Sequence, residues 1–530
     1  MRTAGKKIVA ILLTLTMTMF LFTGCGTDVE GAEENSSSSG NLAVQESAQT
    51  ASEGEMPKVE WATEPVEGSA PEEVVDATVE FSEDEITVDQ GGTDTGMKVQ
   101  GTVLTIQKAG IYQIKGSLAD GQIVIDTQDE DTVKLILNGV KITNSDSAAV
   151  YVASAPKKVT LHIQKGSVNI VEDGADYAQD VVEEDEIKAA IFSKDDLKIS
   201  GSGELYVTGN YNKGIYSKDD LEIKNAGVYV SAVDDAVRGK DSLTVEAAYI
   251  YAQAEGKGLV TEGEMILDGG NYAIDCKDDA IHSNDTITVK DGTFYIAAGD
   301  DGIHADNVLT VENGNLTISG CYEGLEAQKI YYKGGTTRIT AEDDGVNAAG
   351  GKDGSGMQGP GEDPFQIDDD ALIEISGGYL VVDASGDGLD SNGMLAMTGG
   401  TAIVYGPTND GNGALDYNGE FEVSGDATLL AVGSSGMAQG ITESEYGNLA
   451  FTCQVGADTI MSIQDSQGNI IFSFEAPKKY SCVVFTSPQI KSGEEYVVYI
   501  GGSYSKDSVD GVFTQGNYQG GTELGNLSAN

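Results

Sequence analysis

The stretch that decides the fold lies at residues 302–323 and reads GIHADNVLTVENGNLTISGCYE. It holds two short runs in which apolar and polar residues alternate, Leu309 to Val311 and Leu316 to Ile318. Units of 22 residues repeat along the chain, and the apolar residue that opens each one falls at 215, 237, 259, 281, 303, 325 and 346. Two or three short strands per unit, with no helical period, are typical of one turn of a parallel β-helix. We therefore predict an all-β protein, built as a right-handed parallel β-helix with a small C-terminal β-rich module.

Shifts in composition divide the chain into five segments. We predict a signal peptide at 1–24, a flexible acidic stalk at 25–76, the parallel β-helix at 77–435, the C-terminal module at 436–512 and a tail at 513–530. The stalk has few large apolar residues, so it cannot bury a core. Between Val346 and Leu389 the repeat spacing rises to 43 residues, close to two coils, and begins with a Gly-rich stretch that predicts a surface loop.

The N-terminus has the organisation of an export signal. Arg2, Lys6 and Lys7 precede an apolar run at 8–22, and the following Leu21–Cys25 resembles the lipobox of bacterial lipoproteins. That resemblance implies cleavage before Cys25 and acylation of that residue, which would hold the protein on a membrane through lipid alone. The predicted location is extracytoplasmic and lipid-anchored. The alternative is a plain secretory peptide followed by an incidental cysteine.

The charge balance restricts the partners. The chain carries 31 Lys+Arg against 86 Asp+Glu, a formal net charge of −55. Nucleic acids and anionic lipid headgroups need a basic surface, so both are excluded as electrostatic partners. The balance favours cations, or ligands that are reached through cations.

Acidic pairs recur at the start of the repeats, and stacking would turn them into a column. Neighbouring carboxylates about 5 Å apart repel each other by about 3 kcal/mol at an effective dielectric of 20. Calcium binds oxygen at about 2.3–2.6 Å, so one ion can bridge two coils about 4.8 Å apart. Asx side chains just after the junctions, at 285, 306, 347 and 390, could complete its shell. The predicted calcium ligands are Asp234, Asp235, Asp278, Asp279, Asp300, Asp301, Asp343, Asp344, Asp387 and Asp390. The alternative is that Asp-Asp-Gly serves only as turn chemistry on a solvated edge.

Tyrosines form a second row, and histidines form a short third one. Tyr206, Tyr229, Tyr251, Tyr272 and Tyr295 recur 21 to 23 residues apart. Most sit between inward aliphatic residues, so we expect their rings to point outward and to offer a platform for sugar rings. The alternative is that outward tyrosine is simply favoured in strands. His282 and His304 also lie one coil apart, and an outward polar position explains them as well as a metal does.

Four cysteines follow Cys25. Cys276 and Cys321 lie two coils apart, or about 10 Å, which is too far for a disulfide, so we predict free, inward-packed thiols. The sequence does not decide whether Cys453 and Cys482 pair.

These features resemble a family of clostridial cell-surface lipoproteins with a calcium-binding β-helix carbohydrate-binding domain. The resemblance is carried by the lipobox, by AGIYQIKG at 109–116, by DGQIVID at 120–126 and by LNGVKIT at 137–143. It continues in the Asp-Asp-[Gly/Ala] junctions, in SGDGLDSNG at 385–393 and in EAPK at 475–478. It implies a polysaccharide-lyase-like β-helix over 77–435 that binds cellulose or acidic sugars such as polygalacturonate.

Three classes of function remain open at this point. The leading one is non-catalytic, calcium-dependent polysaccharide binding at the bacterial cell surface. The first alternative is a calcium-dependent lyase acting on uronates by β-elimination, with Lys277, or else Arg238 or Lys240, as the base. A lysine flanked by carboxylates stays protonated, which makes it a poor base. The second alternative is a surface adhesin with a protein partner.

Overall fold

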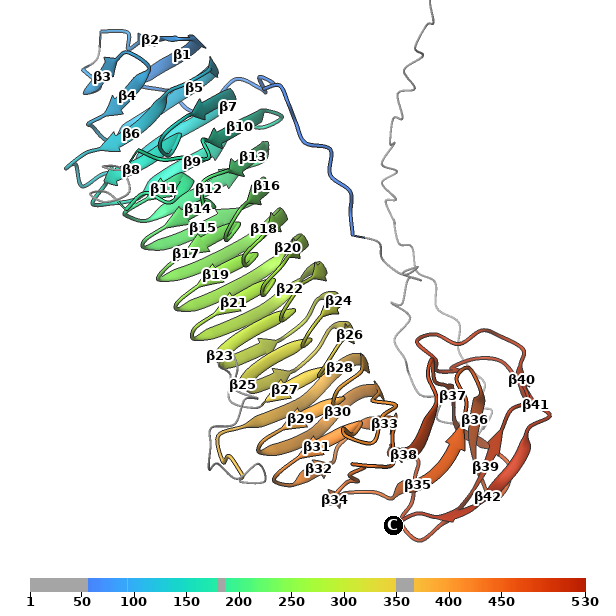
Figure 1. Ribbon diagram of the computed structural model, residues 1–530. Coiled ribbons are helices and arrows are strands. Elements are labelled where there is room, and N and C mark those ends of the chain that lie inside the picture. Colours follow the sequence, from blue (N-terminus) through green and yellow to red (C-terminus); the bar gives the residue numbers. More distant parts are fainter. Residues whose placement is uncertain (1–55, 93, 179–185, 349–366) are drawn as a thin grey trace, which may run out of the picture. The chain divides into compact units, whose positions relative to one another are not determined.

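The computed structural model describes residues 56–92, 94–178, 186–348 and 367–530 (Figure 1). These residues form strands and turns and no helix. The fold is a β-solenoid of about 14 turns with ~23 residues per turn, so the predicted all-β parallel β-helix is confirmed. In the same residues, no helix is long and apolar enough to cross a membrane. The predicted signal peptide and Cys25 lie outside the described residues.

The strands fall into three groups. The first coils contain β1 (Ala77–Glu83), β2 (Glu85–Asp89), β3 (Met97–Gln100), β4 (Val103–Ile106), β5 (Gly110–Leu118), β6 (Gln122–Asp126), β7 (Val133–Asn144), β8 (Val150–Ser154), β9 (Val159–Ile163) and β10 (Val168–Asp173). The regular coils contain β11 (Ala189–Ser193), β12 (Leu197–Gly201), β13 (Glu204–Gly209), β14 (Lys213–Ser217), β15 (Asp220–Lys224), β16 (Gly227–Ala232), β17 (Val237–Gly239), β18 (Ser242–Ala254), β19 (Leu259–Thr261), β20 (Glu264–Cys276), β21 (Ile281–Ser283), β22 (Thr286–Ala297), β23 (Ile303–Val311), β24 (Asn315–Cys321), β25 (Leu325–Tyr332), β26 (Thr336–Ala341), β27 (Val346–Ala348), β28 (Leu372–Ala384), β29 (Leu389–Ser391), β30 (Met394–Tyr405), β31 (Leu415–Tyr417), β32 (Phe421–Val423), β33 (Thr428–Gly433) and β34 (Glu443–Ser444). The C-terminal group contains β35 (Asn448–Val455), β36 (Ile460–Asp465), β37 (Ile470–Glu475), β38 (Tyr480–Thr486), β39 (Glu495–Ile500), β40 (Ser503–Tyr504), β41 (Tyr518–Gln519) and β42 (Thr522–Ser528).

Parallel pairing between successive coils keeps equivalent residues in register. Ile215, Val237, Leu259 and Ile281 follow one another in this way, and all four are fully buried. The residue before each of them is Gly or Ala because the corner is tight. A Cβ on Gly302 would lie 2.5 Å from the Ile318 side chain. The stacked aliphatic side chains therefore form the core, and the small residue before them sets the corner of each coil.

The enlarged spacing after Val346 belongs to one coil and not to two. β27 pairs directly with β29, which places Val346 opposite Leu389. The expectation of nearly two coils is therefore wrong, and the extra residues are an insertion in the sequence of one coil. Residues 349–366 of this insertion, which contain the Gly-rich stretch predicted to form a surface loop, lie outside the described residues. The insertion leaves the register intact, and it brings residues 43 positions apart in the sequence onto neighbouring coils.

The C-terminal group closes the stack. β38 pairs antiparallel with both β33 and β35, which ends the series of parallel coils. β36, β37, β39 and β42 form a separate four-stranded sheet over a core that includes Phe474 and Phe485. β42 lies in the segment expected to be a tail, and it pairs along its length with β39. The last residues thus belong to the module, because β39 offers them a free strand edge.

The described part of the expected stalk lies against the β-helix. Val66 forms an antiparallel bridge with Val168, and the Gly68 amide donates to Asn138 Oδ1 at 2.7 Å. A Cβ on Gly68 would lie 2.3 Å from the Lys165 carbonyl oxygen, so this approach needs glycine. Residues 56–76 therefore form a strap on the first coils, where composition alone predicted a free linker. Backbone hydrogen bonds hold the strap, and these do not depend on large apolar side chains.

The four described cysteines are free. Cys276 and Cys321 are buried in the core, which confirms the prediction for that pair. Cys453 and Cys482 are partly buried thiols in the C-terminal module.

Candidate functional site

Two columns of side chains run along the stack, one at the corner of each coil and one in the strand that follows the corner. These strands are β14, β17, β19, β21, β23, β25, β27, β29 and β31. The junction column holds the residue two positions before the buried apolar residue of each coil. Its members are Lys213, Asp235, Lys257, Asp279, Asp301, Glu323, Asp344, Asp387 and Gly413. The strand column holds the residue just after the apolar one, and β-pairing aligns its members Tyr216, Arg238, Val260, His282, His304, Glu326, Asn347, Asp390 and Asp416. The predicted column of carboxylates therefore exists, but lysines interrupt its first half.

Lysines neutralise the acidic pairs that precede β17 and β21. Lys213 Nζ pairs with Asp234, and it lies 2.8 Å from Asp235 Oδ2. Lys257 Nζ lies 2.9 Å from Asp278 Oδ1 and also pairs with Asp279. Sequence reasoning missed both lysines because each takes the place of an aspartate in the junction column. The signal was the recurring Lys-Gly before the apolar residue at 213–215 and 257–259.

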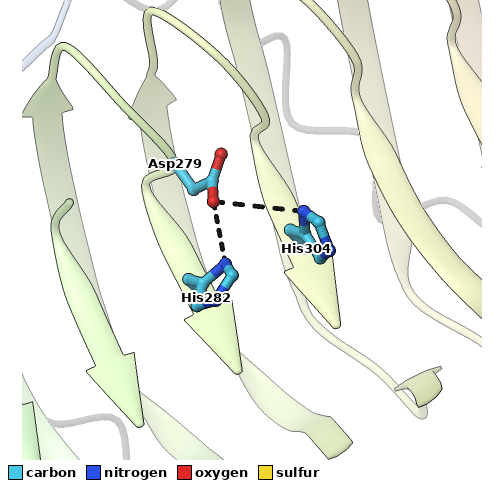
Figure 2. A group of neighbouring side chains, drawn as sticks. All are labelled: Asp279, His282 and His304. Carbon is cyan, nitrogen blue, oxygen red and sulfur yellow. Dashed lines mark hydrogen bonds and ion pairs between the residues drawn. The ribbon is translucent and has the colours of Figure 1, made fainter. Parts of the chain in front are cut away.

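The side chain of Asp279 is fully buried, and neighbouring cationic and imidazole groups compensate for its negative charge. Figure 2 shows it between two imidazoles, with Nδ1 of His282 2.8 Å and Nδ1 of His304 4.0 Å from Asp279 Oδ2. Burial raises the pKa of this carboxyl, but its hydrogen bond to His282 and its pairing with Lys257 hold it well below the usual range. Asp279 is therefore an ionised carboxylate whose charge is already balanced by its own neighbours.

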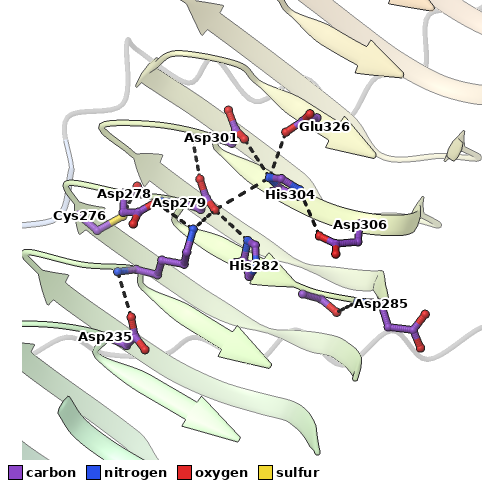
Figure 3. A network of polar contacts seen from close by, with 12 residues as sticks. Asp235, Cys276, Asp278, Asp279, His282, Asp285, Asp301, His304, Asp306 and Glu326 are labelled. Atoms are coloured by element: carbon purple, nitrogen blue, oxygen red, sulfur yellow. Dashed lines mark hydrogen bonds and ion pairs between the residues drawn. The ribbon is translucent and has the colours of Figure 1, made fainter. Parts of the chain in front are cut away.

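The next coil carries a second buried group, drawn with its neighbours in Figure 3. Nδ1 of His304 lies 3.1 Å from Asp301 Oδ2 and 3.0 Å from Glu326 Oε2. All three side chains are buried. Asp300, the outer member of this pair, is exposed. The structure thus joins the two predicted rows, acidic and imidazole, at this coil.

The last junctions hold three carboxylates, of Asp344, Asp387 and Asp390, that form no ion pair with a lysine or arginine among the described residues. Asp344, Asp387 and Asp390 each offer an oxygen, and these oxygens lie within 4.8 Å of one another. The Asp387 amide donates to Asp344 Oδ1 at 2.5 Å, which fixes the two coils together. We call Asp344, Asp387 and Asp390 the carboxylate cluster. Asp343 and Asp416 lie close enough to add their negative charge.

The environment of the carboxylate cluster disfavours its negative charges. Burial, followed by repulsion from Asp387, raises the pKa of Asp344 to about 7. Burial also raises the pKa of Asp387 to about 6. For Asp390, burial and then Asp344 raise the pKa well above its ordinary value. Without a cation, such a group holds protons near neutral pH, and a divalent ion would take their place.

Next to the carboxylate cluster lies an amide oxygen, of Asn347, that has no hydrogen-bond partner in the described part of the chain. Asn347 is 3% exposed and lies beside Asp390 in the strand column. Its Nδ2 donates to Glu323 Oε2 at 2.7 Å, on the side of the preceding coil. Its Oδ1 is buried, and none of the described residues donates a hydrogen bond to it. A buried amide oxygen without a donor costs about 1–3 kcal/mol, so it marks a place where a cation would be stabilised. Of the other predicted Asx ligands, Asp285 receives a bond from Asn307 Nδ2, and Asp306 lies 3.6 Å from Nε2 of His304.

The tyrosine row is real, but one member was misplaced. Pairing aligns Tyr206, Tyr229 and Tyr251 with Ala273 and then Tyr295. Tyr272 points inward, is 1% exposed and stacks on Phe294 with ring centroids 4.2 Å apart. The prediction that Tyr272 faces outward is wrong, because a spacing of 21 rather than 22 residues moves a side chain to the opposite face.

The strap covers the beginning of this row. The Trp61 ring lies 5.7 Å from that of Tyr206 and 6.4 Å from that of Tyr251, edge-on to both. Tyr206 is only 7% exposed, and it stacks on Tyr229. Tyr229, Tyr251 and Tyr295 keep partly exposed rings. Sequence reasoning missed Trp61 because it lies in a segment assigned to the stalk.

Models of a family described as carbohydrate-binding domain-containing proteins match residues 100–345 and 260–411, together more than half of the chain. A carbohydrate-binding domain-containing protein of Acetivibrio thermocellus is 36% identical over 141 residues, which are 27% of this chain and 48% of the relative. The chain thus matches about half the length of this relative. A polysaccharide lyase-like protein from C. thermocellum, solved as a gadolinium derivative, is 31% identical with a TM-score of 0.43, over 45% of this chain and 97% of its own.

Proposed function

The chain belongs to the family of carbohydrate-binding domain-containing proteins, and on that premise we propose that it binds acidic polysaccharide through calcium without cleaving it. The observation that carries this proposal is the carboxylate cluster of Asp344, Asp387 and Asp390, which has no lysine or arginine partner in the described parts of the chain. Of the acidic junctions predicted to bind calcium, this one needs a cation most.

The chemistry of the cluster favours calcium over other common ions. Calcium takes six to eight oxygen ligands in flexible geometry. Asp344, Asp387 and Asp390 supply carboxylates, and Asn347 supplies a neutral amide oxygen. Magnesium is less suitable because it keeps its own waters and demands a strict octahedron. The remaining calcium positions would be filled by water or by an oxygen of the ligand.

Bridging by calcium explains how an acidic protein can hold an acidic sugar. A chain with a net charge of −55 repels polyanions at long range. A calcium ion with open coordination positions accepts a uronate carboxylate directly and converts this repulsion into a local attraction. The ligand class is therefore a uronate-containing polysaccharide such as polygalacturonate, with a neutral glucan such as cellulose as the second candidate.

The exposed tyrosines offer a second contact for the same polymer. Tyr229, Tyr251 and Tyr295 present partly exposed rings along one face, and aromatic rings stack on the CH-rich faces of pyranoses. In this proposal Tyr206 serves the strap rather than the sugar, because Trp61 packs against it. Tyr272 has no part in binding.

The proposed location follows from the N-terminal sequence. The Leu21–Cys25 lipobox would be processed before Cys25, and the acylated cysteine would hold the domain outside the cytoplasm. A binding domain placed there would keep polysaccharide close to the cell.

The test compares the wild type with Asp390→Asn, and with Asp291→Asn as a matched control for an exposed aspartate away from the cluster. Affinity electrophoresis through gels containing polygalacturonate or a soluble glucan, with calcium or with chelator, reports retardation. We expect retardation by polygalacturonate only with calcium, lost in Asp390→Asn and kept in Asp291→Asn. Retardation that is equal in chelator would contradict the calcium bridge. Steady release of unsaturated products, lost in Lys277→Ala, would instead establish the lyase.

A further inference from the structure

Near its N-terminal end the strap carries Trp61, the only tryptophan in the sequence. The Trp61 ring lies 5.7 Å from that of Tyr206 and 6.4 Å from that of Tyr251, at interplanar angles of 64° and 80°. Tyr206 is a ring on which the strap packs, but Tyr251 belongs to the three partly exposed rings that offer a surface for sugar. Trp61 therefore lies against a ring that a pyranose would also contact.

The two ends of the strap are held in different ways. From Thr63 onwards the strap is bonded to the first coils. The Thr63 carbonyl accepts a hydrogen bond from Lys141 Nζ at 2.8 Å, and Val66 exchanges two backbone hydrogen bonds with Val168, at 3.0 and 2.9 Å. Residues 56–62, in contrast, form no hydrogen bond with any other described residue. Packing alone holds this end in the described part of the chain, so Trp61 can swing away about Thr63 without breaking a hydrogen bond.

The far end of the tyrosine row is covered in a different way. Arg338 follows Thr317 in the row, and its Nε and Nη2 each lie 2.8 Å from one carboxylate oxygen of Asp510. The next three members of the row are buried in the core of the C-terminal module, and they are Val381, Ile403 and Leu430. A bidentate ion pair and a shared core fix this end. A polymer on the rings of Tyr251 and Tyr295 can therefore extend further only towards the strap.

The packing of Trp61 is weak enough for a ligand to displace it. Two edge-on aromatic pairs favour the closed strap by a factor of about 10. A ligand that needs the open strap binds with its intrinsic affinity multiplied by the open fraction. The closed strap would thus weaken binding at Tyr251 by about the same factor, without any change in the sugar contacts themselves.

We propose that the strap is a built-in competitor of the polysaccharide, with Trp61 and a sugar ring excluding each other at Tyr251. This inference rests on the proposed function, because it concerns the regulation of the same row of sugar contacts. Tyr295, two coils further along the row, is partly exposed with the strap closed. The closed protein therefore offers a short platform, and a polymer that contacts Tyr251 lengthens this platform by displacing residues 56–62.

Because Trp61 is the only tryptophan, its fluorescence reports directly on the strap. In the full-length protein without ligand, Tyr206→Ala removes a ring that Trp61 contacts, and it should shift the emission to longer wavelength and increase quenching by acrylamide. Tyr295→Ala removes a ring of the same row two coils beyond Tyr251, so its emission should match that of the wild type. Equal emission from Tyr206→Ala and the wild type would overturn the closed strap.

The competition itself is tested with polygalacturonate and calcium. Binding to the wild type should shift the Trp61 emission to longer wavelength over the same ligand concentrations that retard the protein in affinity electrophoresis. Trp61→Ala should bind at least about threefold more tightly, whereas Thr63→Ala, which changes an exposed side chain of the same strap, should bind as the wild type does. Retardation without an emission shift, or a Trp61→Ala variant that binds no more tightly, would overturn the competition and leave the proposed function standing. No retardation of any of these proteins would overturn both.

Discussion

The junction at Asp278–Asp279 and the junction at Asp343–Asp344 carry the same dipeptide at the same corner, yet their surroundings are opposite. At the first, Lys257 reaches up from the preceding coil and His282 closes the other side, so the buried carboxylate is held ionised. At the second, the neighbouring coil supplies Asp387 and Asp390, and the charges repel each other. In a stacked repeat, the chemistry of a motif is therefore decided by what occupies the same position one coil away.

The largest loss of stability is expected from a substitution that breaks the compensated junction at Asp278–Asp279. Asp279→Ala would take the buried carboxylate away from His282 and from the half-buried Lys257, and it would remove the acceptor of the Asp301 amide. Breaking a buried ion pair costs about 3–5 kcal/mol, which urea unfolding of the domain would detect as a lower midpoint. Asp278→Ala serves as the control, because its side chain is 45% exposed, and its cost should be about 0–1 kcal/mol. Equal losses in the two variants would contradict the proposed difference.

The next largest effect on stability is expected at the carboxylate cluster, where removing a carboxylate should stabilise the calcium-free domain. In chelator, Asp390→Asn should stabilise the domain by about 1 kcal/mol or more, because it removes a carboxyl group whose ionised form is strongly disfavoured in the folded state by burial and by the neighbouring carboxylates. In calcium the same variant should melt below the wild type, because it loses a ligand and with it the stabilisation by the bound ion. Thermal melts in the two conditions should therefore cross over. A variant that is less stable in both conditions would show that Asp390 serves packing rather than ion binding.

The pH dependence of the calcium-free protein should sharpen the contrast. The folded-state pKa values of Asp344 and Asp387, about 7 and about 6, lie above the ordinary value of 3.8. The folded state therefore binds more protons than the unfolded state across this range. Stability that is present at about pH 4 is lost as the pH rises through about 7. Urea midpoints measured in chelator should fall across this window and should fall less in Asp344→Asn. Calcium should remove most of the fall, because the ion replaces the protons.

The smallest effect is expected for Lys213, because a second cation partly compensates for the loss of its positive charge. Asp235 keeps Arg238 as a second cation, with Nη1 3.2 Å from Asp235 Oδ2. Lys213→Gln should therefore cost only about 1 kcal/mol in urea unfolding, and it should not create a calcium site. New calcium binding in this variant would show that removing one lysine converts a compensated junction into a metal site.

The period of the repeat was enough to predict the fold, because a strict spacing of 22 residues with alternating apolar residues has few other solutions. The acidic rows were equally visible. Two features of the site could not be predicted from the sequence. The contact between Asp344 and Asp387 spans 43 residues and depends on an insertion that leaves the register unchanged. Lys213 and Lys257 were overlooked because they replace the residue that defines the motif.

The aromatic row shows a different limit of sequence reasoning. A tyrosine at alternate positions of a strand belongs to opposite faces, so a one-residue difference in spacing placed Tyr272 in the core. Trp61 was missed for another reason: it contacts Tyr206 and Tyr251, which lie 145 and 190 residues further along the chain, and no local pattern marks such a pair.

The central claim is tested most directly by isothermal titration calorimetry. Calcium is added to the wild type, to Asp390→Asn and to Asp278→Asn after bound metal has been removed with chelator. If the uncompensated coils hold the ion, the wild type and Asp278→Asn bind calcium alike, and Asp390→Asn loses that binding event. Unchanged calcium binding in Asp390→Asn, or its loss in Asp278→Asn, would contradict the account.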